Sequence, residues 1–184
     1  MSYKHGTYQR EGDTAFQLPV VLDYGYFIVG TAPIHKVKAS NRKVNEVLRI
    51  GTYQEALEYF GDTYDKDFSI SQAIKIFFEL YGVAPLYIVN ILNPEKHRTE
   101  KKTLTSQPLE RGKLLLANHK IIPETVVVKD SSSQAVVSDV KTIFTAEGLE
   151  IYAKVAGNNI DVEYEEVDLS KVTKAEAIGG FDSE

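Results

Sequence analysis

Two apolar segments with a helical stretch between them constrain this fold more than any other feature of the sequence. Residues 24–30 and 85–92 are rich in aromatic and β-branched side chains, which is typical of β-strands. The order strand, helices, strand predicts two neighbouring parallel strands joined by a right-handed crossover. Four consecutive apolar side chains at 26–29 predict that the first strand is buried on both faces. The polar, basic residues 34–46 predict a surface loop, and 47–50 a short further strand.

The stretch between the two main strands contains start and stop signals for two helices. Residues 52–55 have the capping-box form Thr-x-x-Glu, in which both side chains bond to free backbone N–H groups, and Gly61 ends this helix. Residues 69–72 repeat the device as Ser-x-x-Gln, and Gly82 ends the second helix. Additional apolar residues predict that the second helix is well buried, namely Ile76, Phe78 and Leu80.

The second half of the chain predicts a small antiparallel β domain. Residues 149–155 and 160–165 alternate apolar and polar side chains about a Gly-Asn-Asn turn at 157–159. This pattern predicts a hairpin with one buried and one solvated face. Further short strands are predicted from apolar runs at residues 114–116, 125–129 and 139–144.

The predicted fold class is therefore mixed α/β (α+β), with four parts along the chain. Residues 1–22 form an extended N-terminal arm, residues 23–98 form a βααβ unit, and residues 99–170 form the small antiparallel β domain. Residues 171–184 are interpreted as a linker toward a missing C-terminal domain, because they contain two glycines followed by an aromatic residue.

Three aromatic side chains lie along the otherwise polar arm, at Tyr3, Tyr8 and Phe16. Aromatic anchors are enriched where one protein docks on another, and adding an extended segment to a sheet edge is a general route to polymers. We therefore predict that these three residues are subunit contacts. The alternative is that they fold back on their own domain.

The sequence contains no pattern that predicts a catalytic, metal or cofactor site. It has no cysteine, which excludes disulfides, thiolate metal sites and cysteine nucleophiles. Its four histidines have no ligand partner at helical or hairpin spacing, and phosphate-binding loops and a nucleophile elbow are absent. We predict a protein that is not an enzyme and uses no cofactor, although spacing does not exclude a catalytic site assembled from distant residues.

The charge pattern argues against nucleic acid as a partner, and the length of the apolar runs argues against a membrane. The net charge is −5, and the densest basic cluster, at 96–102, has acidic residues interleaved. The acidic run at 163–168 predicts a solvated strand edge that discourages mispairing. No apolar run approaches the roughly 20 residues that cross a bilayer, and the N-terminus has no signal-peptide core. We therefore expect folding in the cytosol.

Several motifs, in order along the whole chain, resemble tail sheath proteins of contractile phages, of the prophage and phage-tail-like bacteriocin type. The N-terminal motifs are MSYKHGTY at residues 1–8 and VGTAPI at residues 29–34. The later motifs are SQAI with the following Phe-Phe at 71–78, APLYIVNILNP at 84–94, VEY at 162–164, DLSKVT at 168–173 and IGG at 178–180.

The resemblance implies a structural role. Such subunits polymerise around a tail tube and contract when the baseplate is triggered, which drives the tube through the target cell envelope. The implied partners are neighbouring sheath subunits, the tail tube and the baseplate, in a virion tail assembled in the host bacterial cytoplasm. Arms tie neighbouring subunits together in this family, and residues 1–22 match the N-terminal arm. Family members are usually longer, so the C-terminal arm and most tube-facing surface would be missing here.

Two other functions fit the sequence. The chain could be a small α/β ligand-binding domain of an enzyme, which predicts a concave pocket with perturbed titratable groups beyond the first strand. It could also be another virion component, such as a tube or baseplate protein, which predicts oligomers of fixed size rather than long tubes.

Overall fold

Three short strands form the first sheet, in the order β1-β3-β2. The computed structural model describes residues 25–62 and 65–173 of the chain. Strand β1 (Tyr26–Gly30) pairs in parallel with β3 (Leu86–Asn90), so the predicted parallel pair is confirmed. The short strand predicted at 47–50 is also present, as β2 (Val47–Ile50), and it runs antiparallel to β3. The mixed α/β fold class is therefore correct.

The first helix, α1 (Tyr53–Phe60), begins and ends where the sequence predicts. The Thr52 hydroxyl accepts the N–H of Glu55 at 3.2 Å, which satisfies one free donor of the first turn. The Glu55 carboxylate reaches back and accepts the N–H of Gly51 at 2.9 Å. The chain leaves the helix at Gly61 with φ +81°, a conformation that glycine adopts without strain.

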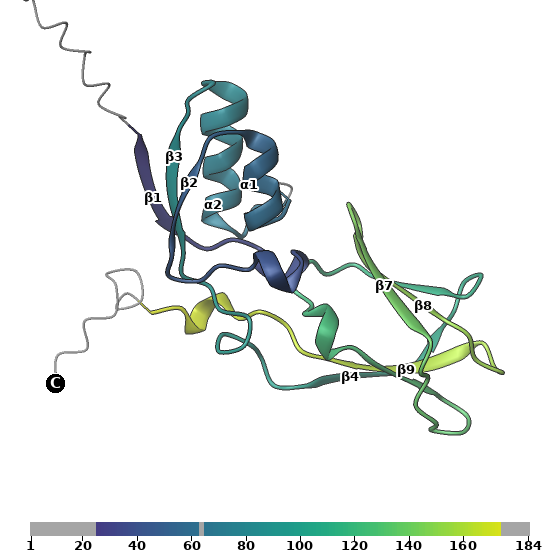
Figure 1. The fold of residues 1–184 in the computed structure, drawn as a ribbon. Helices are drawn as coiled ribbons and strands as arrows, with labels where there is room; N and C mark the ends of the chain where they lie inside the picture. The colour runs from purple at the N-terminus through teal and green to yellow at the C-terminus, as the bar shows by residue number, and fades with distance from the viewer. Residues whose placement is uncertain (1–24, 63–64, 174–184) are drawn as a thin grey trace, which may run out of the picture.

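The second helix starts as α2 (Ser69–Ile74) and continues as a π-helical segment, η3 (Lys75–Leu80), before Gly82 at φ +60° ends it. Both helices lie on the same side of the β1-β3-β2 sheet, so one face of the sheet is covered and the other is not (Figure 1). Nine side chains form the core between the sheet and the helices: Ala32, Ile34, Ile50, Ala56, Phe60, Ile70, Ile74, Leu86 and Ile88.

The capping box predicted for this second helix is wrong. Ser69 is the first helical residue rather than the cap, and its hydroxyl accepts the N–H of Thr31 at 3.0 Å. Gln72 donates its side-chain amide to the carbonyl of Lys66 instead of reaching the helix start. The Ser69 side chain therefore fastens the end of β1 to the start of the helix. A Cβ at Gly30 would lie 2.3 Å from the Ser69 oxygen, so this contact requires glycine there.

The predictions of burial around these helices are also corrected. Ile76 and Leu80 are exposed, because they lie on a helix that is covered on one side only, and the helix is not well buried. The predicted surface loop at 34–46 contains two 3₁₀ turns, η1 (Ile34–Lys36) and η2 (Ala39–Asn41). Ile34 and His35 in the first turn are fully buried.

The β domain consists of two three-stranded antiparallel sheets that share one core, in the orders β4-β9-β6 and β5-β8-β7. The strands are β4 (Lys102–Pro108), β5 (Lys113–Leu116), β6 (Val127–Asp130), β7 (Val140–Thr145), β8 (Gly148–Ala153) and β9 (Asn159–Tyr164). The shared core is made of Leu114, Leu116, Ile121, Val128, Leu149, Ile151, Ala153, Ile160, Val162 and Tyr164.

The predicted hairpin of residues 149–165 is wrong, although its inward-facing residues are correct. Strand β8 pairs with β5 and β7, whereas β9 pairs with β4 and β6. The turn at 157–159 therefore carries the chain from one sheet to the facing sheet. Alternation alone cannot separate the two cases, because both place the same side chains in one core. The hairpin that does form joins β7 to β8, where Thr145 is opposite Gly148.

The outer face of β9 is not fully solvated as predicted, because Asp161 is buried. Its carboxylate accepts the backbone N–H of Ser106, the hydroxyl of Ser131 and the side-chain amide of Gln134. These hydrogen bonds to the charged form lower the pKa of Asp161 to about 2. One carboxylate thus holds strand β4 and the turn after β6 against β9.

A third apolar cluster joins the α/β unit to the β domain, and we call it the joint. Two ion pairs connect the units beside it: Arg42 with Glu124, and Lys120 with Asp67. Two further short turns lie here, η4 (Pro123–Thr125) and η5 (Leu169–Lys171). The buried residues of the joint are Phe68, Leu92, Ile122 and Val167, with Leu169 and Val172 packed against them.

Among residues 25–62 and 65–173, no helix has the length and apolar character needed to cross a membrane. The predicted arm at 1–22 lies outside these residues, as does most of the predicted linker at 171–184. Both remain predictions.

Gly148 provides a test of the β7–β8 hairpin. It has φ +144°, and a Cβ there would lie 2.1 Å from the carbonyl oxygen of Leu116. We expect Gly148→Ala to lower the free energy of unfolding by about 2 kcal/mol or more, because both the backbone conformation and the space exclude a side chain. Urea denaturation followed by circular dichroism measures this. The control is Gly157→Ala, where a Cβ would meet nothing within 4 Å; equal losses in both variants would contradict this hairpin geometry.

Candidate assembly surface

Strand β1 lies at the edge of its sheet and is exposed, so the prediction that it is buried on both faces is wrong. Tyr26, Phe27 and Val29 are 55%, 61% and 40% exposed. Only β3 pairs with β1 among the strands of the structure's described part. A run of apolar residues indicates a strand but does not say whether a second strand covers its other edge.

Part of the β1 backbone has no hydrogen-bond partner among the residues that the structure describes. The N–H of Ile91 donates to the carbonyl of Gly30 at 2.9 Å, so Gly30 faces β3. Because the direction of these groups alternates along a strand, the N–H and C=O groups of Phe27 and Val29 point to the open edge. The strand has no charged residue, proline or bulge, which are the features that normally prevent pairing with another chain.

Other edges of the protein carry such protection. The edge strand β4 begins with Lys102, ends with Pro108, and has an irregular register between Leu104 and Gln107. Lys129 of the edge strand β6 forms an isolated bridge with Val136, which covers part of that edge. The open edge of β1 therefore contrasts with the edges of the β domain.

The face of the first sheet opposite the helices is mostly apolar, and no helix or strand of residues 25–62 and 65–173 covers it. Strand register aligns its side chains in two rows that cross the three strands. Parallel strand pairs are normally buried on both faces, so this face has the character of an interface. The first row is Phe27, Tyr87 and Arg49, and the second is Val29, Val89 and Val47.

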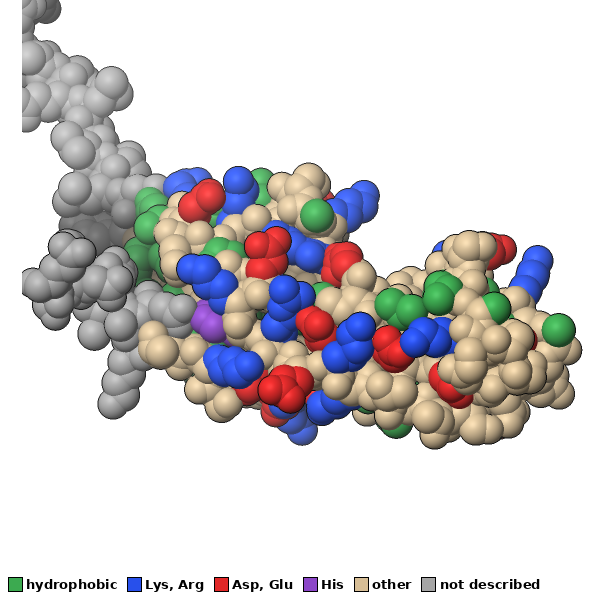
Figure 2. Space-filling model, turned by 90° about the horizontal axis from the view of Figure 1, so that it is seen from below, with side chains coloured by type: hydrophobic (Ala, Val, Ile, Leu, Met, Phe, Trp, Pro, Cys, Tyr) green, Lys and Arg blue, Asp and Glu red, His purple; other side chains and the backbone are tan. Residues whose placement is uncertain are grey.

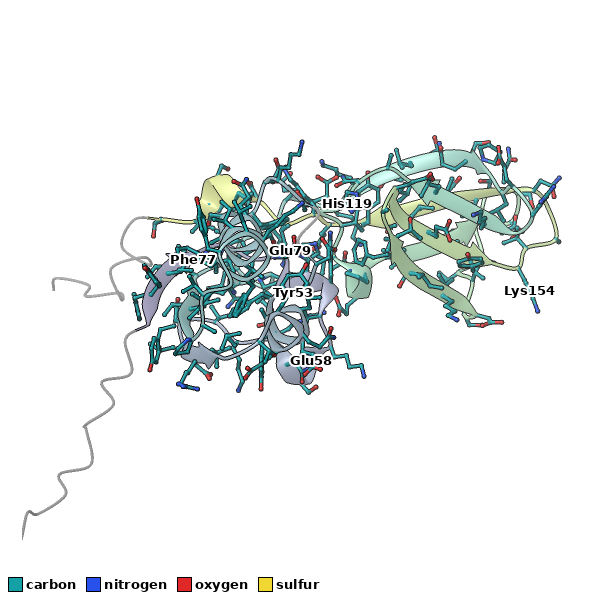
Figure 3. The ribbon with its side chains drawn as sticks, turned by 90° about the horizontal axis from the view of Figure 1, so that it is seen from above. Tyr53, Glu58, Phe77, Glu79, His119 and Lys154 are labelled. Atoms are coloured by element: carbon teal, nitrogen blue, oxygen red, sulfur yellow. The ribbon has the colours of Figure 1, made fainter. Side chains whose placement is uncertain are left out.

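Exposed apolar side chains are concentrated in the α/β unit. Of the eleven large exposed hydrophobic residues in the described part of the chain, seven lie between residues 26 and 81, although this stretch is the smaller part of it. Three of them, Ile76, Leu80 and Tyr81, belong to the end of the second helix. The ring of Phe77, from the same segment, packs against that of Tyr26, with 5.0 Å between the ring centroids. Strand β1 and this helix end therefore form neighbouring surfaces (Figure 3). We call the β1 edge, the uncovered face and this helix end the assembly surface.

The subunit contacts predicted from the sequence, Tyr3, Tyr8 and Phe16, lie outside the described residues, so they remain a prediction. The structure adds the assembly surface, which the sequence reading missed. The apolar run at 26–29 is the available signal, but the same pattern predicts a buried strand.

The basic cluster at 96–102 and the acidic run at 163–168 pair with each other. Basic and acidic side chains alternate along this side of the molecule (Figure 2). Glu166 is buried, so the predicted solvated edge is wrong for this residue. Hydrogen bonds from Lys129 and Lys101 lower the pKa of Glu163. The ion pairs are Arg98 with Glu165 at 2.9 Å, Lys101 with Glu163 at 3.3 Å and Lys102 with Glu166 at 2.9 Å.

A groove of about 820 Å³ lies where the α/β unit meets β7 of the β domain. Tyr53 and Glu58 of α1 and Glu79 of η3 line one side (Figure 3), and Phe144 of β7 lines the other. No group of three or more metal-ligating side chains occurs in the part of the chain that the structure describes.

No protein-family model, curated protein or solved structure matches this chain.

The uncovered sheet face can be tested with a fluorescent dye that binds exposed apolar surface. We expect the double variant Phe27→Ser with Val47→Ser to reduce the fluorescence of bound anilinonaphthalene sulfonate, because both side chains are exposed on this face. The free energy of unfolding should change by less than about 0.5 kcal/mol. Val136→Ser on the β domain is the control, since Val136 is equally exposed but isolated from this face. An equal loss of fluorescence in the control would contradict the assignment.

Proposed function

We propose that this protein is a structural subunit of a contractile tail sheath, which polymerises around a tail tube and contracts to drive it through a cell envelope. The observation that carries the proposal is the unprotected apolar edge of β1 beside an uncovered apolar sheet face. The ordered motifs that resemble sheath proteins supply the specific identity. The proposed partners are neighbouring subunits, the tail tube and the baseplate.

Strand addition at β1 would give such a polymer a repeated contact. The outward N–H and C=O groups of Phe27 and Val29 can pair with an extended segment of a neighbour. The side chains of Tyr26, Phe27 and Val29 would be covered at the same time. Complete burial of a large, fully exposed apolar side chain contributes roughly 1.5–3 kcal/mol. Because these three side chains are 40–61% exposed, covering them contributes on the order of 3 kcal/mol before the entropy of association is subtracted.

The distribution of apolar surface favours an open polymer over a closed dimer. The β1 edge, the uncovered sheet face and the helix end at Leu80 present different surfaces to different directions. Contacts between unlike surfaces repeat from one subunit to the next and build rings or helices. A sheath needs contacts of this kind, because each subunit has neighbours within its ring and in the rings on either side.

The joint supports a mechanical role. Its apolar cluster and the ion pairs Arg42–Glu124 and Lys120–Asp67 hold the α/β unit against the β domain. A subunit whose two parts are fixed together can pass force from one neighbour to another. Contraction of this kind is driven by repacking of subunits, so we propose no cofactor and no catalytic activity.

The proposal is tested by negative-stain electron microscopy of the purified product of the full reading frame that contains this chain, and of two variants of it. Val29→Pro removes an N–H that points to the open edge, whereas Val29→Thr keeps that N–H and a β-branched side chain. We expect the unchanged protein and Val29→Thr to form hollow tubes or stacked rings. We expect Val29→Pro to remain in small particles, with an unchanged circular dichroism spectrum.

Two outcomes would count against the proposal. Small particles of the unchanged protein, at concentrations where sheaths assemble, would contradict the sheath function. Closed oligomers of fixed size would instead favour another tube or baseplate component of a virion. Tubes formed equally well by Val29→Pro would keep the sheath function and contradict the role of the β1 edge.

A further inference from the structure

We propose that His35 is an acid-sensitive contact of the joint, and that its protonation releases the β domain from the α/β unit. This inference concerns the joint rather than the assembly surface, and it does not depend on the proposed function. It rests on the position of the imidazole ring, its hydrogen bonds and the charges that surround it.

The ring of His35 is buried and makes one hydrogen bond across the joint. Its Nε2 lies 2.7 Å from the carbonyl oxygen of His119, which follows strand β5 in the β domain. A carbonyl oxygen only accepts, so Nε2 carries the proton and Nδ1 is the bare nitrogen of a neutral ring. This Nδ1 is buried without a hydrogen-bond partner in the described structure.

Apolar groups from both units surround the ring. The ring centroid of Phe68, in the α/β unit, lies 5.8 Å from that of His35. The ring of Phe144, in strand β7, meets the imidazole edge-on, with 6.0 Å between the centroids. His119 lies between the helices and the β domain (Figure 3). His35 is therefore enclosed by the contact between the units, and separating them would expose it to water.

The charges near the ring disfavour a second proton. Lys36 and Arg42 lie on the same stretch of chain as His35, and both repel a charged imidazole. Asp62, after α1, is the nearby carboxylate, but it already bonds to Lys36 at 3.0 Å. The Nζ of Lys36 also lies 5.2 Å from the ring centre of Phe144. A proton on Nδ1 would thus add a third cation and a donor with no acceptor.

Burial, followed by these charges, lowers the pKa of His35 to about 4 in the closed joint. An exposed histidine has a pKa of about 6.5. Between these values the open form binds more protons, so lowering the pH favours opening. The ratio of closed to open molecules should fall by about 300-fold as the pH decreases from above 6.5 to below 4.

Other groups at the joint also respond to acid. Glu124 pairs with Arg42, and Asp67 pairs with Lys120, so protonation of either carboxylate weakens the contact between the units. The Nδ1 of His119 lies 3.4 Å from the Nζ of Lys36. An experiment must therefore separate His35 from these groups.

The experiment measures the distance between the units by fluorescence energy transfer as a function of pH. The protein has no native cysteine, so Glu58→Cys and Lys154→Cys create unique labelling sites on exposed positions of α1 and the β domain (Figure 3). We expect transfer in this labelled protein to fall between pH 6.5 and 4 while circular dichroism shows the strands intact. Adding His35→Gln, which can still donate to the His119 carbonyl but does not titrate, should shift the change to lower pH by at least one unit.

His119→Gln is the matched control, because it removes the neighbouring imidazole at the joint and keeps the backbone carbonyl that His35 uses. It should open at the same pH as the unsubstituted labelled protein. The proposal is overturned if His35→Gln opens at that same pH as well, since the carboxylates would then be responsible. It is also overturned if transfer is lost only when circular dichroism is lost. Nitrogen chemical shifts of His35 in the native sequence provide an independent readout, and they should change together with the distance.

Discussion

One buried side chain, Asn90 at the end of β3, fixes the arrangement on which the rest of the structure depends. Its Oδ1 accepts the N–H groups of Ala32 and Leu92, and its Nδ2 donates to the carbonyls of Lys43 and Leu92. Asn90 is 1% exposed, and both the oxygen and the nitrogen of its side-chain amide make hydrogen bonds. A satisfied buried amide of this kind permits one geometry, because any shift would leave a polar group unpaired.

The hydrogen bonds of Asn90 also affect the joint, because they position the segments that contain Ala32 and Leu92. Ala32 leads directly to Ile34 and His35, and Leu92 belongs to the apolar cluster of the joint. The end of the first sheet therefore sets where the β domain docks. The same site that completes the βααβ unit positions the buried histidine against the carbonyl of His119. The joint and the assembly surface are also connected by the second helix, which starts beside Phe68 of the joint and ends at Leu80 of the assembly surface.

The sequence predicted features that depend on local chemistry and failed for those that depend on neighbours. The cap at Thr52, the stop at Gly61 and the parallel pair of β1 with β3 follow from residue type and spacing, and they are present. The exposure of Phe27 does not follow, because it depends on a strand that is not beside it. The local sequence does not decide whether β8 pairs with β9 or lies in a separate sheet, as it does here. It also does not decide whether the Ser69 hydroxyl caps its own helix or bonds to Thr31, as it does here. The sequence does not predict the assembly surface for the same reason, since an apolar run has the same composition whether it lies in a core or at an interface.

Strand β1 has two features that favour association with other chains and that monomeric proteins normally avoid. Its edge offers unpaired backbone groups, and its uncovered face offers Phe27 and Val29 to water. A single lysine at position 27 or 29 would leave the β1–β3 ladder intact and remove the hazard, as Lys102 does at the edge of β4. The β domain shows that this chain contains such protection where an edge stays free. Strand β1 carries no charge, and coverage by a neighbouring subunit, as we propose, would account for both the edge and the face.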